Sequence, residues 1–275
     1  MKKLLPNWFK ILIYKISGKK PWSRGYFIFK FFYIKKAIYD KELMDKFKNS
    51  KILPKNYGFA IDERVVEYPW LLTRMSKEKG NLLDAGSALN FKEILEFPAI
   101  NNKKITIVNL NPEENCFWQK RISYLYCDIR CLPFANETFD YIACISTLEH
   151  IGMDNSIYTK NKSKENDNFD FEAAILELKR VLKKGGRIFI TVPFGKYQDI
   201  GRLQQFDSER LNQIIEQFAP AQKRIDFYKY SKNGWNISGK KDCQDCEYFN
   251  IYKEKKAPED FAAASRAVAC IEMAK

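Results

Sequence analysis

The chain has 275 residues, of which 45% are hydrophobic and 29% are charged, which argues against both a disordered chain and a membrane-embedded one. Its 47 Lys and Arg residues outnumber 34 Asp and Glu, and the resulting net charge of +13 suggests an anionic partner. The excess is local, because residues 1–40 carry +9 and the other 235 residues carry only +4. The same forty residues hold eleven aromatic side chains.

Residues 1–60 are predicted to form a basic, aromatic N-terminal extension. Within it, residues 8–16 and 26–39 could each form an amphipathic helix with lysines along one edge. No apolar run approaches the eighteen residues that a membrane-spanning helix needs, and no cleavable signal is apparent. Lysines attract anionic headgroups and aromatic rings favour the interface, so residues 1–40 suggest contact with the inner membrane face.

The seven cysteines are dispersed, and several lie inside apolar runs. Buried, reduced thiols explain this distribution better than disulfides do, so a cytoplasmic location is expected. Only Cys243 and Cys246 have the spacing of metal ligands, and with no second pair and a single histidine they do not predict a metal site.

From Gly80 onward, short apolar runs alternate with helical segments, which predicts an α/β sheet that is mostly parallel and covered on both faces. Strands are expected at residues 81–86, 105–110, 122–128, 139–146, 186–194, 224–230 and 267–274. Helices are expected at 171–185, where Gly185 and Gly186 would end the helix, and at 207–218, where Asp207 or Ser208 would cap it.

Two further segments have distinct patterns. Residues 61–70 lead into a helix with Pro69 near its first turn, and Gly80 would close that helix. Residues 154–170 are polar and charged and follow the fourth strand, at the edge where such sheets bind ligands. A loop of this length is either a lid or a disordered insertion, and both alternatives stay open.

Small and polar residues stand where the predicted strands end. Gly86 and Ser87 would let the backbone turn sharply after the first strand and approach a ligand closely. This turn alone does not distinguish a ligand site from a tight structural turn. The series continues with Asn109 after the second strand, Asp128 after the third and Ser146 after the fourth.

Three segments in this order resemble the class I S-adenosylmethionine-dependent methyltransferases, in particular the branch with a methyltransferase domain 11 core. They are LLDAGSALN (82–90), CDIRCLPFANETFDYIACISTLEHIG (127–152) and ELKRVLKKGGRIFITVPF (177–194). The resemblance implies a Rossmann-like, seven-stranded, mostly parallel sheet with helices on both faces and an antiparallel last strand at 267–274. It also implies a methyltransferase domain over residues 61–275 and S-adenosylmethionine as the cofactor.

The resemblance further implies which residues bind the cofactor: Asp84, Gly86, Ser87, Asn109, Leu110, Asp128, Ile129 and Ser146. Asp84 and Gly86 would line the methionine end, and Ser146 would lie near the sulfonium. Asp128 would accept a hydrogen bond from the adenine amine while Ile129 covers the ring.

At the ribose the chain departs from the family pattern. An acidic residue usually binds the ribose hydroxyls, but Asn109 occupies its place, so help from Asn111 or Glu113 is expected.

His150, the only histidine, follows the fourth strand and is predicted to be the general base, since its ordinary pKa near 6.5 suits that role. The alternative that it caps or packs against the following helix remains open, as do Glu149 and Tyr68 as bases. Residues 67–70 could fold over the methionine end of the cofactor, or could form a hydrophobic staple, a contact between apolar side chains at the start of the helix.

The predicted reaction is methylation of a small molecule or glycan, on oxygen, with a lipid-linked saccharide at the membrane surface as one possible acceptor. Three alternatives remain. A nucleic-acid methyltransferase suits the charge, but no Asn/Asp-Pro-Pro-Tyr/Phe element follows the fourth strand. A nicotinamide-dependent enzyme is disfavoured by missing glycines, and the last alternative is a catalytically degenerate interaction protein. Which molecule is the acceptor, and which of its atoms is methylated if not an oxygen, stay open at this point, as does the oligomeric state.

Overall fold

The structure is a computed structural model, and it describes residues 5–113, 115–120, 122–156, 165, 167–251, 253–254, 256 and 258–275. Residues 157–164 and 166 of the predicted lid or disordered insertion lie outside this part of the chain. In the described residues, no helix combines the length and the apolar character needed to cross a membrane. The same residues contain no cluster of three His, Cys, Asp or Glu side chains placed to hold a metal ion.

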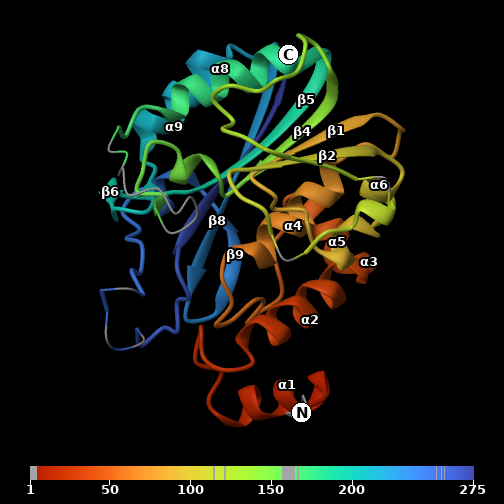
Figure 1. Cartoon of the computed structure of the whole chain (residues 1–275). Coiled ribbons are helices and arrows are strands. Elements are labelled where there is room, and N and C mark those ends of the chain that lie inside the picture. The colour runs from red at the N-terminus through yellow and green to blue at the C-terminus, as the bar shows by residue number, and fades with distance from the viewer. Residues whose placement is uncertain are drawn as a thin grey trace.

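A central sheet organises the molecule, with the strand order β3-β2-β1-β4-β5-β10-β8-β9 (Figure 1). The strands are β1 (Asn81–Ala85), β2 (Lys104–Asn109), β3 (Ser123–Tyr126), β4 (Phe139–Ile145), β5 (Leu182–Pro193), β8 (Gln222–Ser231), β9 (Gly234–Ser238) and β10 (Ala267–Ala274). Strands β1 to β5 pair in parallel, whereas β10 is antiparallel to both β5 and β8. The predicted mostly parallel sheet with an antiparallel last strand is confirmed.

The predicted strand count of seven is wrong, because the described residues form a sheet of eight strands. The additional strand, β9, forms a hairpin with β8 in which Ser231 pairs with Gly234. Gly234 has a φ of 82°, a conformation that glycine adopts without strain. The Asn233-Gly234 pair is a strong sequence signal for a hairpin, and the prediction of seven strands overlooked it.

Helices cover both faces of the sheet, as predicted (Figure 1). The α-helices are α1 (Asn7–Ile16), α2 (Tyr26–Tyr39), α3 (Lys41–Lys48), α4 (Arg64–Arg74), α5 (Lys92–Leu95), α6 (Pro98–Asn101), α8 (Phe171–Val181), α9 (Ser208–Phe218) and α10 (Lys240–Cys243). The short elements are the 3-10 helices η1 (Trp118–Lys120) and η2 (Leu148–His150) and the small hairpin β6 (Gln198–Asp199) with β7 (Gln204–Gln205). One hydrophobic cluster joins α2, α3 and α4 to the sheet, and a second joins α8 and α9 to the opposite face.

Two helix ends differ from the sequence prediction. Helix α8 ends at Val181 rather than at Gly185, because Leu182 already pairs with Phe139 of β4 and so begins β5. Helix α4 ends at Arg74, well before Gly80. The predicted cap of α9 is confirmed, since the Asp207 side chain accepts a hydrogen bond from the backbone N–H of Arg210 at 3.0 Å.

Pro69 lies in the interior of α4 rather than in its first turn, because the helix begins at Arg64. A proline has no N–H, so the carbonyl of Val65, four residues earlier, loses its helical partner. The hydroxyl of buried Tyr57 donates a hydrogen bond to this carbonyl at 2.7 Å. A side chain from the N-terminal sixty residues therefore satisfies the backbone group that Pro69 leaves open.

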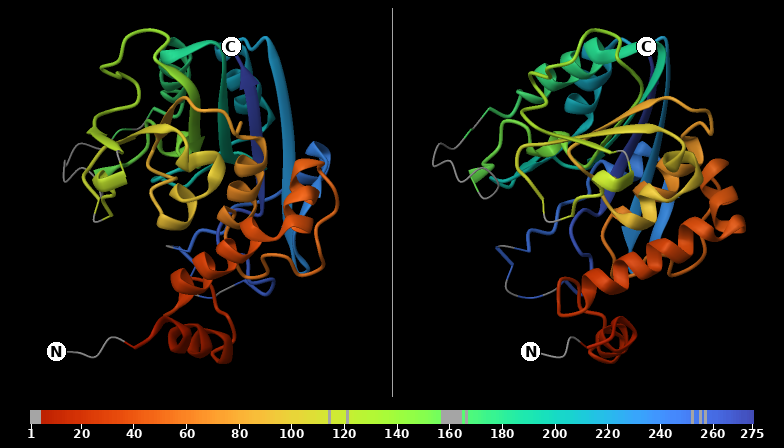
Figure 2. Two further views of the ribbon diagram at one scale, coloured as in Figure 1. Left: turned by 90° about the vertical axis from the view of Figure 1, so that its right-hand side faces the viewer. Right: turned by 45° about the vertical axis from the view of Figure 1, so that its right-hand side comes forward.

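The helices of residues 1–60 share the core of the sheet. Tyr26 and Ile34 of α2 and Phe47 of α3 are completely buried in the same cluster as α4. Lys30 of α2 forms an ion pair at 2.7 Å with Asp62, and both side chains are buried. Helix α1 lies farther from the sheet than α2 in both views of Figure 2. The division of the chain at residue 60 into an extension and a domain stays a prediction.

Candidate functional site

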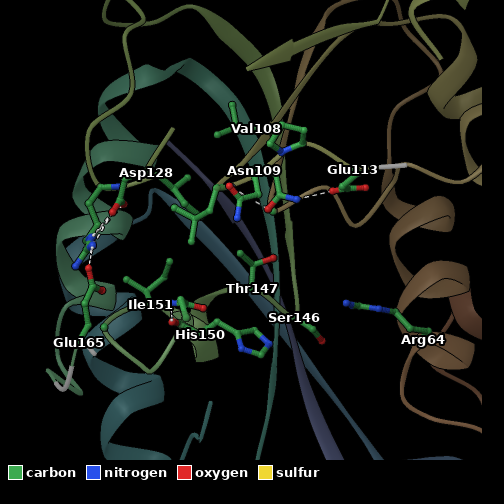
Figure 3. Close-up of a pocket in the computed structure, with 18 residues that line it drawn as sticks. Arg64, Val108, Asn109, Glu113, Asp128, Ser146, Thr147, His150, Ile151 and Glu165 are labelled. Atoms are coloured by element: carbon green, nitrogen blue, oxygen red, sulfur yellow. Dashed lines mark hydrogen bonds and ion pairs between the residues drawn. The ribbon is translucent and has the colours of Figure 1, made fainter. Parts of the chain in front are cut away.

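A cavity of about 580 Å³ opens beyond the carboxyl ends of the parallel strands (Figure 3). The predicted site residues that line it are Gly86, Asn109, Leu110, Asp128, Ile129, Ser146 and His150. They come from the segments after β1, β2, β3 and β4, which the parallel sheet brings to one edge. Asp84 and Ser87 do not line the cavity, because both are buried on either side of Gly86 in the same turn.

Gly86 is required by the geometry of this turn. It has a φ of 105°, and a Cβ built on it would lie 2.1 Å from Oγ1 of Thr147. Both the backbone conformation and the close approach exclude a side chain. The turn after β1 therefore packs directly against the turn after β4, where both line the cavity.

Two buried polar atoms beside Gly86 have no hydrogen-bond partner among the described residues, Oδ1 of Asp84 and Oγ of Ser87. The other carboxylate oxygen of Asp84 accepts from the backbone N–H of Leu89 at 2.8 Å. Burial raises the pKa of the Asp84 carboxyl to about 7, although that hydrogen bond opposes the shift. Unpartnered buried polar atoms are costly, so they mark a place where a polar ligand would be stabilised.

Asn109 stands where the family pattern expects an acidic residue, and a carboxylate lies next to it. The Asn109 amide donates to Oε1 of Glu113 at 2.5 Å, and Asn90 donates to Oε2 of the same side chain at 3.0 Å. Glu113 lines the cavity, on the wall opposite His150 in Figure 3. The negative charge missing at Asn109 is thus present four residues later.

Asp128 is held by an arginine two residues away. Arg130 contacts Asp128 at 2.5 Å, Glu165 at 2.8 Å and Asp170 at 2.5 Å. Burial raises the pKa of the Asp128 carboxyl, but the hydrogen bonds and charge of Arg130 outweigh it and hold the pKa below its ordinary value. Asp128 therefore stays ionised, and two described residues of the predicted lid or disordered insertion are tied to the cavity rim.

Ser146 is fixed by a buried carboxylate that the sequence did not indicate. Oγ of Ser146 and Oγ1 of Thr191 each donate to Oε1 of Glu67 at 2.6 Å. Oε2 of Glu67 forms an ion pair with Arg64 at 2.7 Å, and the Glu67 side chain is completely buried. Arg64 lines the cavity and is drawn on the side of Ser146 in Figure 3.

The region around Arg64 contains more carboxyl groups than guanidinium groups. Glu63 and Glu149 are also close enough to raise the pKa of Arg64. Burial first, and neighbouring carboxylates second, raise the pKa of Glu63 to about 8, and burial raises that of Glu149 well above its ordinary value. Neither residue lines the cavity. Tyr68, the other candidate base, donates its hydroxyl to the Ala88 carbonyl at 2.7 Å and does not line the cavity either.

His150 lies at the cavity wall at the end of η2. Its Nδ1 is 2.8 Å from the carbonyl oxygen of Arg202, and because a carbonyl can only accept, Nδ1 carries the proton. Burial lowers the pKa of His150 below 6.5; the Arg202 hydrogen bond opposes this, and the charge of Arg64 adds to it. At neutral pH the ring is therefore uncharged, with the lone pair on Nε2.

Comparison with known proteins agrees with this geometry. Residues 84–190 match the family model described as a methyltransferase domain, which runs from Asp84 in β1 to Ile190 in β5 and includes the cavity-lining turns. This part of the chain is a methyltransferase domain, as the resemblance in the sequence implied. No curated protein sequence matches the chain.

Solved structures similar to the chain are low in sequence identity. The 1,6-didemethyltoxoflavin-N1-methyltransferase of Burkholderia thailandensis, with S-adenosylhomocysteine bound, is 13% identical over 72% of each chain, with a TM-score of 0.43. The YcgJ protein of a Bacillus species is 13% identical over 76% of this chain and 97% of its own, with a TM-score of 0.47. A Thermotoga maritima methyltransferase, described as a possible histamine N-methyltransferase, is 12% identical over 88% of this chain and 99% of its own, with a TM-score of 0.46. Such distant likenesses do not identify an acceptor.

The residues around the cavity fit S-adenosylmethionine. The turn at Gly86 excludes a side chain, unpartnered polar atoms of Asp84 and Ser87 are buried beside that turn, and Glu113 and Asp128 supply carboxylates in the cavity lining. Glu113 lines the cavity, as does Asn111, the other residue expected to help at the ribose, whereas Arg64 was not predicted from the sequence. No sequence pattern marks Arg64 as a site residue, because only the packing of α4 against the sheet brings it to the cavity wall.

Proposed function

We propose that the protein transfers a methyl group to a hydroxyl of a small molecule or glycan, with His150 as the general base. The observation that supports this most is the position of His150 at the cavity wall, with its Nδ1–H bonded to the Arg202 carbonyl. A hydroxyl needs to lose its proton as it attacks, whereas a neutral amine has a lone pair already. A neutral base suits this task beside a positively charged donor.

Each part of the cofactor would have a partner in the cavity. S-adenosylmethionine supplies the methyl group on a positively charged sulfur. We propose that Glu113, assisted by Asn109, accepts hydrogen bonds from the ribose hydroxyls and that Asp128 accepts from the adenine amine. Arg64 would bind the carboxylate of the methionine moiety, because a guanidinium is well matched to that group. Asp84 supports the turn at Gly86 by accepting from the backbone N–H of Leu89, although its side chain, like that of Ser87, does not line the cavity.

The pH dependence of the reaction tests the role of His150. We expect the rate of hydroxyl methylation to rise with pH and to level off with a midpoint below 6.5, because burial lowers the pKa of His150 and only the neutral ring accepts a proton. His150→Ala should lower kcat by about 10²–10⁴-fold and remove this midpoint. The measurement is transfer of labelled methyl groups to panels of methyl glycosides, phenols and primary amines.

A matched variant distinguishes a base from a residue that only holds the loop. His150→Asn keeps an N–H that can reach the Arg202 carbonyl but has no basic nitrogen, so it should be as inactive as His150→Ala. Added imidazole should restore part of the activity of His150→Ala. Activity of His150→Asn within a few-fold of the wild type, or transfer to the amines alone, would contradict the proposal.

The affinity for the cofactor tests the role of Glu113. Glu113→Gln keeps the size and the polarity of the side chain but removes its charge, so hydrogen bonds from the ribose hydroxyls should weaken. We expect S-adenosylhomocysteine to bind about 5-fold more weakly by calorimetry, since hydrogen bonds to charged groups are stronger than neutral ones by about 1 kcal/mol. Exposed Glu216→Gln on α9 is the control and should bind as the wild type does.

A ribose analogue makes this test specific. The wild type should prefer S-adenosylhomocysteine to its 2′-deoxy and 3′-deoxy analogues, and this preference should shrink in Glu113→Gln. An unchanged preference would assign the ribose to another side chain, with Asn111 as the next candidate on the cavity wall.

A further inference from the structure

Helix α1 presents an apolar stripe to solvent. Trp8, Leu12 and Ile16 are 66%, 43% and 77% exposed. Their spacing of four residues places them one above the other on a single helix face. Grouped large apolar side chains that remain in water mark an interaction surface more often than a structural accident.

The opposite face of α1 fixes the direction of this stripe. Tyr14 is completely buried, and its ring centroid lies 5.0 Å from that of Phe29 in α2. A Cβ built on Gly25, at the start of α2, would lie 2.8 Å from the carbonyl oxygen of Lys10, so the two helices pack closely. Helix α1 lies at the outer end of the molecule in both views of Figure 2. The stripe therefore faces away from the body.

The surface around the stripe is cationic. Lys15 lies on the same exposed face of α1, and Lys19 and Lys20 are exposed in the turn that follows it. The sequence contains no acidic residue before Asp40. Apolar side chains bordered by lysines complement a surface that is negatively charged outside and apolar just beneath.

We propose that this face of α1 docks on a bilayer that contains anionic lipids. Lysines bind the headgroups, while Trp8, Leu12 and Ile16 enter the boundary between headgroups and acyl chains. A ten-residue helix is too short to cross the membrane, so it lies in the plane of the interface. A nucleic acid would also attract the lysines, but its backbone offers no apolar phase for Leu12 and Ile16. This docking does not depend on the proposed reaction.

Sedimentation with vesicles tests the proposal without cofactor or acceptor. The full chain should sediment with vesicles of equal parts phosphatidylcholine and phosphatidylglycerol, and not with phosphatidylcholine alone. Replacing Trp8, Leu12 and Ile16 together by Ser should weaken binding at least about 10-fold, because the buried apolar area is lost. Replacing Lys15, Lys19 and Lys20 together by Glu should weaken it at least about 100-fold.

Two controls match these variants. Trp118→Ser removes a tryptophan that is also 66% exposed but lies on η1, and replacing Lys77, Lys79 and Lys232 by Glu makes the same charge change elsewhere. Both should bind as the wild type does. Far-UV circular dichroism establishes that each variant is folded.

A second measurement needs only a conservative change. Brominated acyl chains in the same anionic vesicles should quench part of the wild-type fluorescence, and Trp8→Phe should remove that part while Trp118→Phe retains it. The proposal is overturned if the full chain does not sediment with anionic vesicles, or if the α1 and control variants bind equally. It is also overturned if the chain binds single-stranded RNA through these lysines but does not bind vesicles.

Discussion

Gly86→Ala is expected to abolish measurable cofactor binding at concentrations that saturate the wild type. The new Cβ would lie 2.1 Å from Oγ1 of Thr147, and the φ of 105° is strained for alanine. The turn after β1 would have to move away from the turn after β4, and a displacement of about 1 Å in a binding site can cost about 100-fold. Calorimetry with S-adenosylhomocysteine measures the loss, and thermal unfolding should show a destabilisation of about 1–3 kcal/mol.

Two variants separate the close contact from the backbone strain. Gly185 has a φ of 74° and nothing within 4 Å of a built Cβ, so Gly185→Ala introduces strain without a clash. It should lower stability and leave cofactor affinity unchanged. Thr147→Ala removes Oγ1 and the methyl group that the new Cβ would meet. The double variant Gly86→Ala with Thr147→Ala should therefore recover part of the cofactor affinity that Gly86→Ala loses. If Gly86→Ala bound the cofactor as the wild type does, the turn after β1 would not form part of the site.

Lys30→Met is expected to lower the free energy of unfolding by about 3–5 kcal/mol, because it leaves the buried Asp62 carboxylate without its cation. The two side chains are 6% and 4% exposed, and Nζ lies 2.7 Å from Oδ2. The hydroxyl of Tyr26 also donates to this oxygen at 2.9 Å, but a neutral hydroxyl does not neutralise the charge. Chemical denaturation followed by circular dichroism measures the effect.

The matched control is Lys35→Met, which removes an exposed lysine of the same helix and should change stability by less than about 0.5 kcal/mol. Lys30→Met combined with Asp62→Asn removes both charges and should recover much of the loss. A loss from Lys30→Met no larger than that from Lys35→Met would mean that α2 contributes little to the folding of the core.

The sheet could be predicted because its central strands are buried on both faces. Buried parallel strands are continuous apolar runs, and the runs at β1, β2, β4 and β5 are bounded by polar turns. The last strand was found for the same reason. Helix α3 was missed although its sequence carries the signals, since Asp40 caps it and Leu43 and Phe47 are spaced as one buried face.

The site was predictable only where its residues follow a strand. Gly86, Asp128, Ser146 and His150 stand at strand ends, and the sheet brings them together at one cavity. Arg64 precedes the first strand, and its place at the wall depends on how α4 packs, which no local pattern encodes. The buried carboxylate of Glu67 lay within a segment for which the sequence left two roles open, and its partners are far away in the chain.

Asp62, which forms the buried ion pair with Lys30, precedes Arg64 by two residues in the chain. Arg64 lies at the cavity wall. Consecutive Cα atoms are about 3.8 Å apart, so the chain between Asp62 and Arg64 has no slack with which to absorb a displacement. The ion pair of Lys30 with Asp62 therefore ties helix α2 to the segment that carries Arg64. We expect any displacement of α2 to be felt at Arg64 and therefore at the cavity wall.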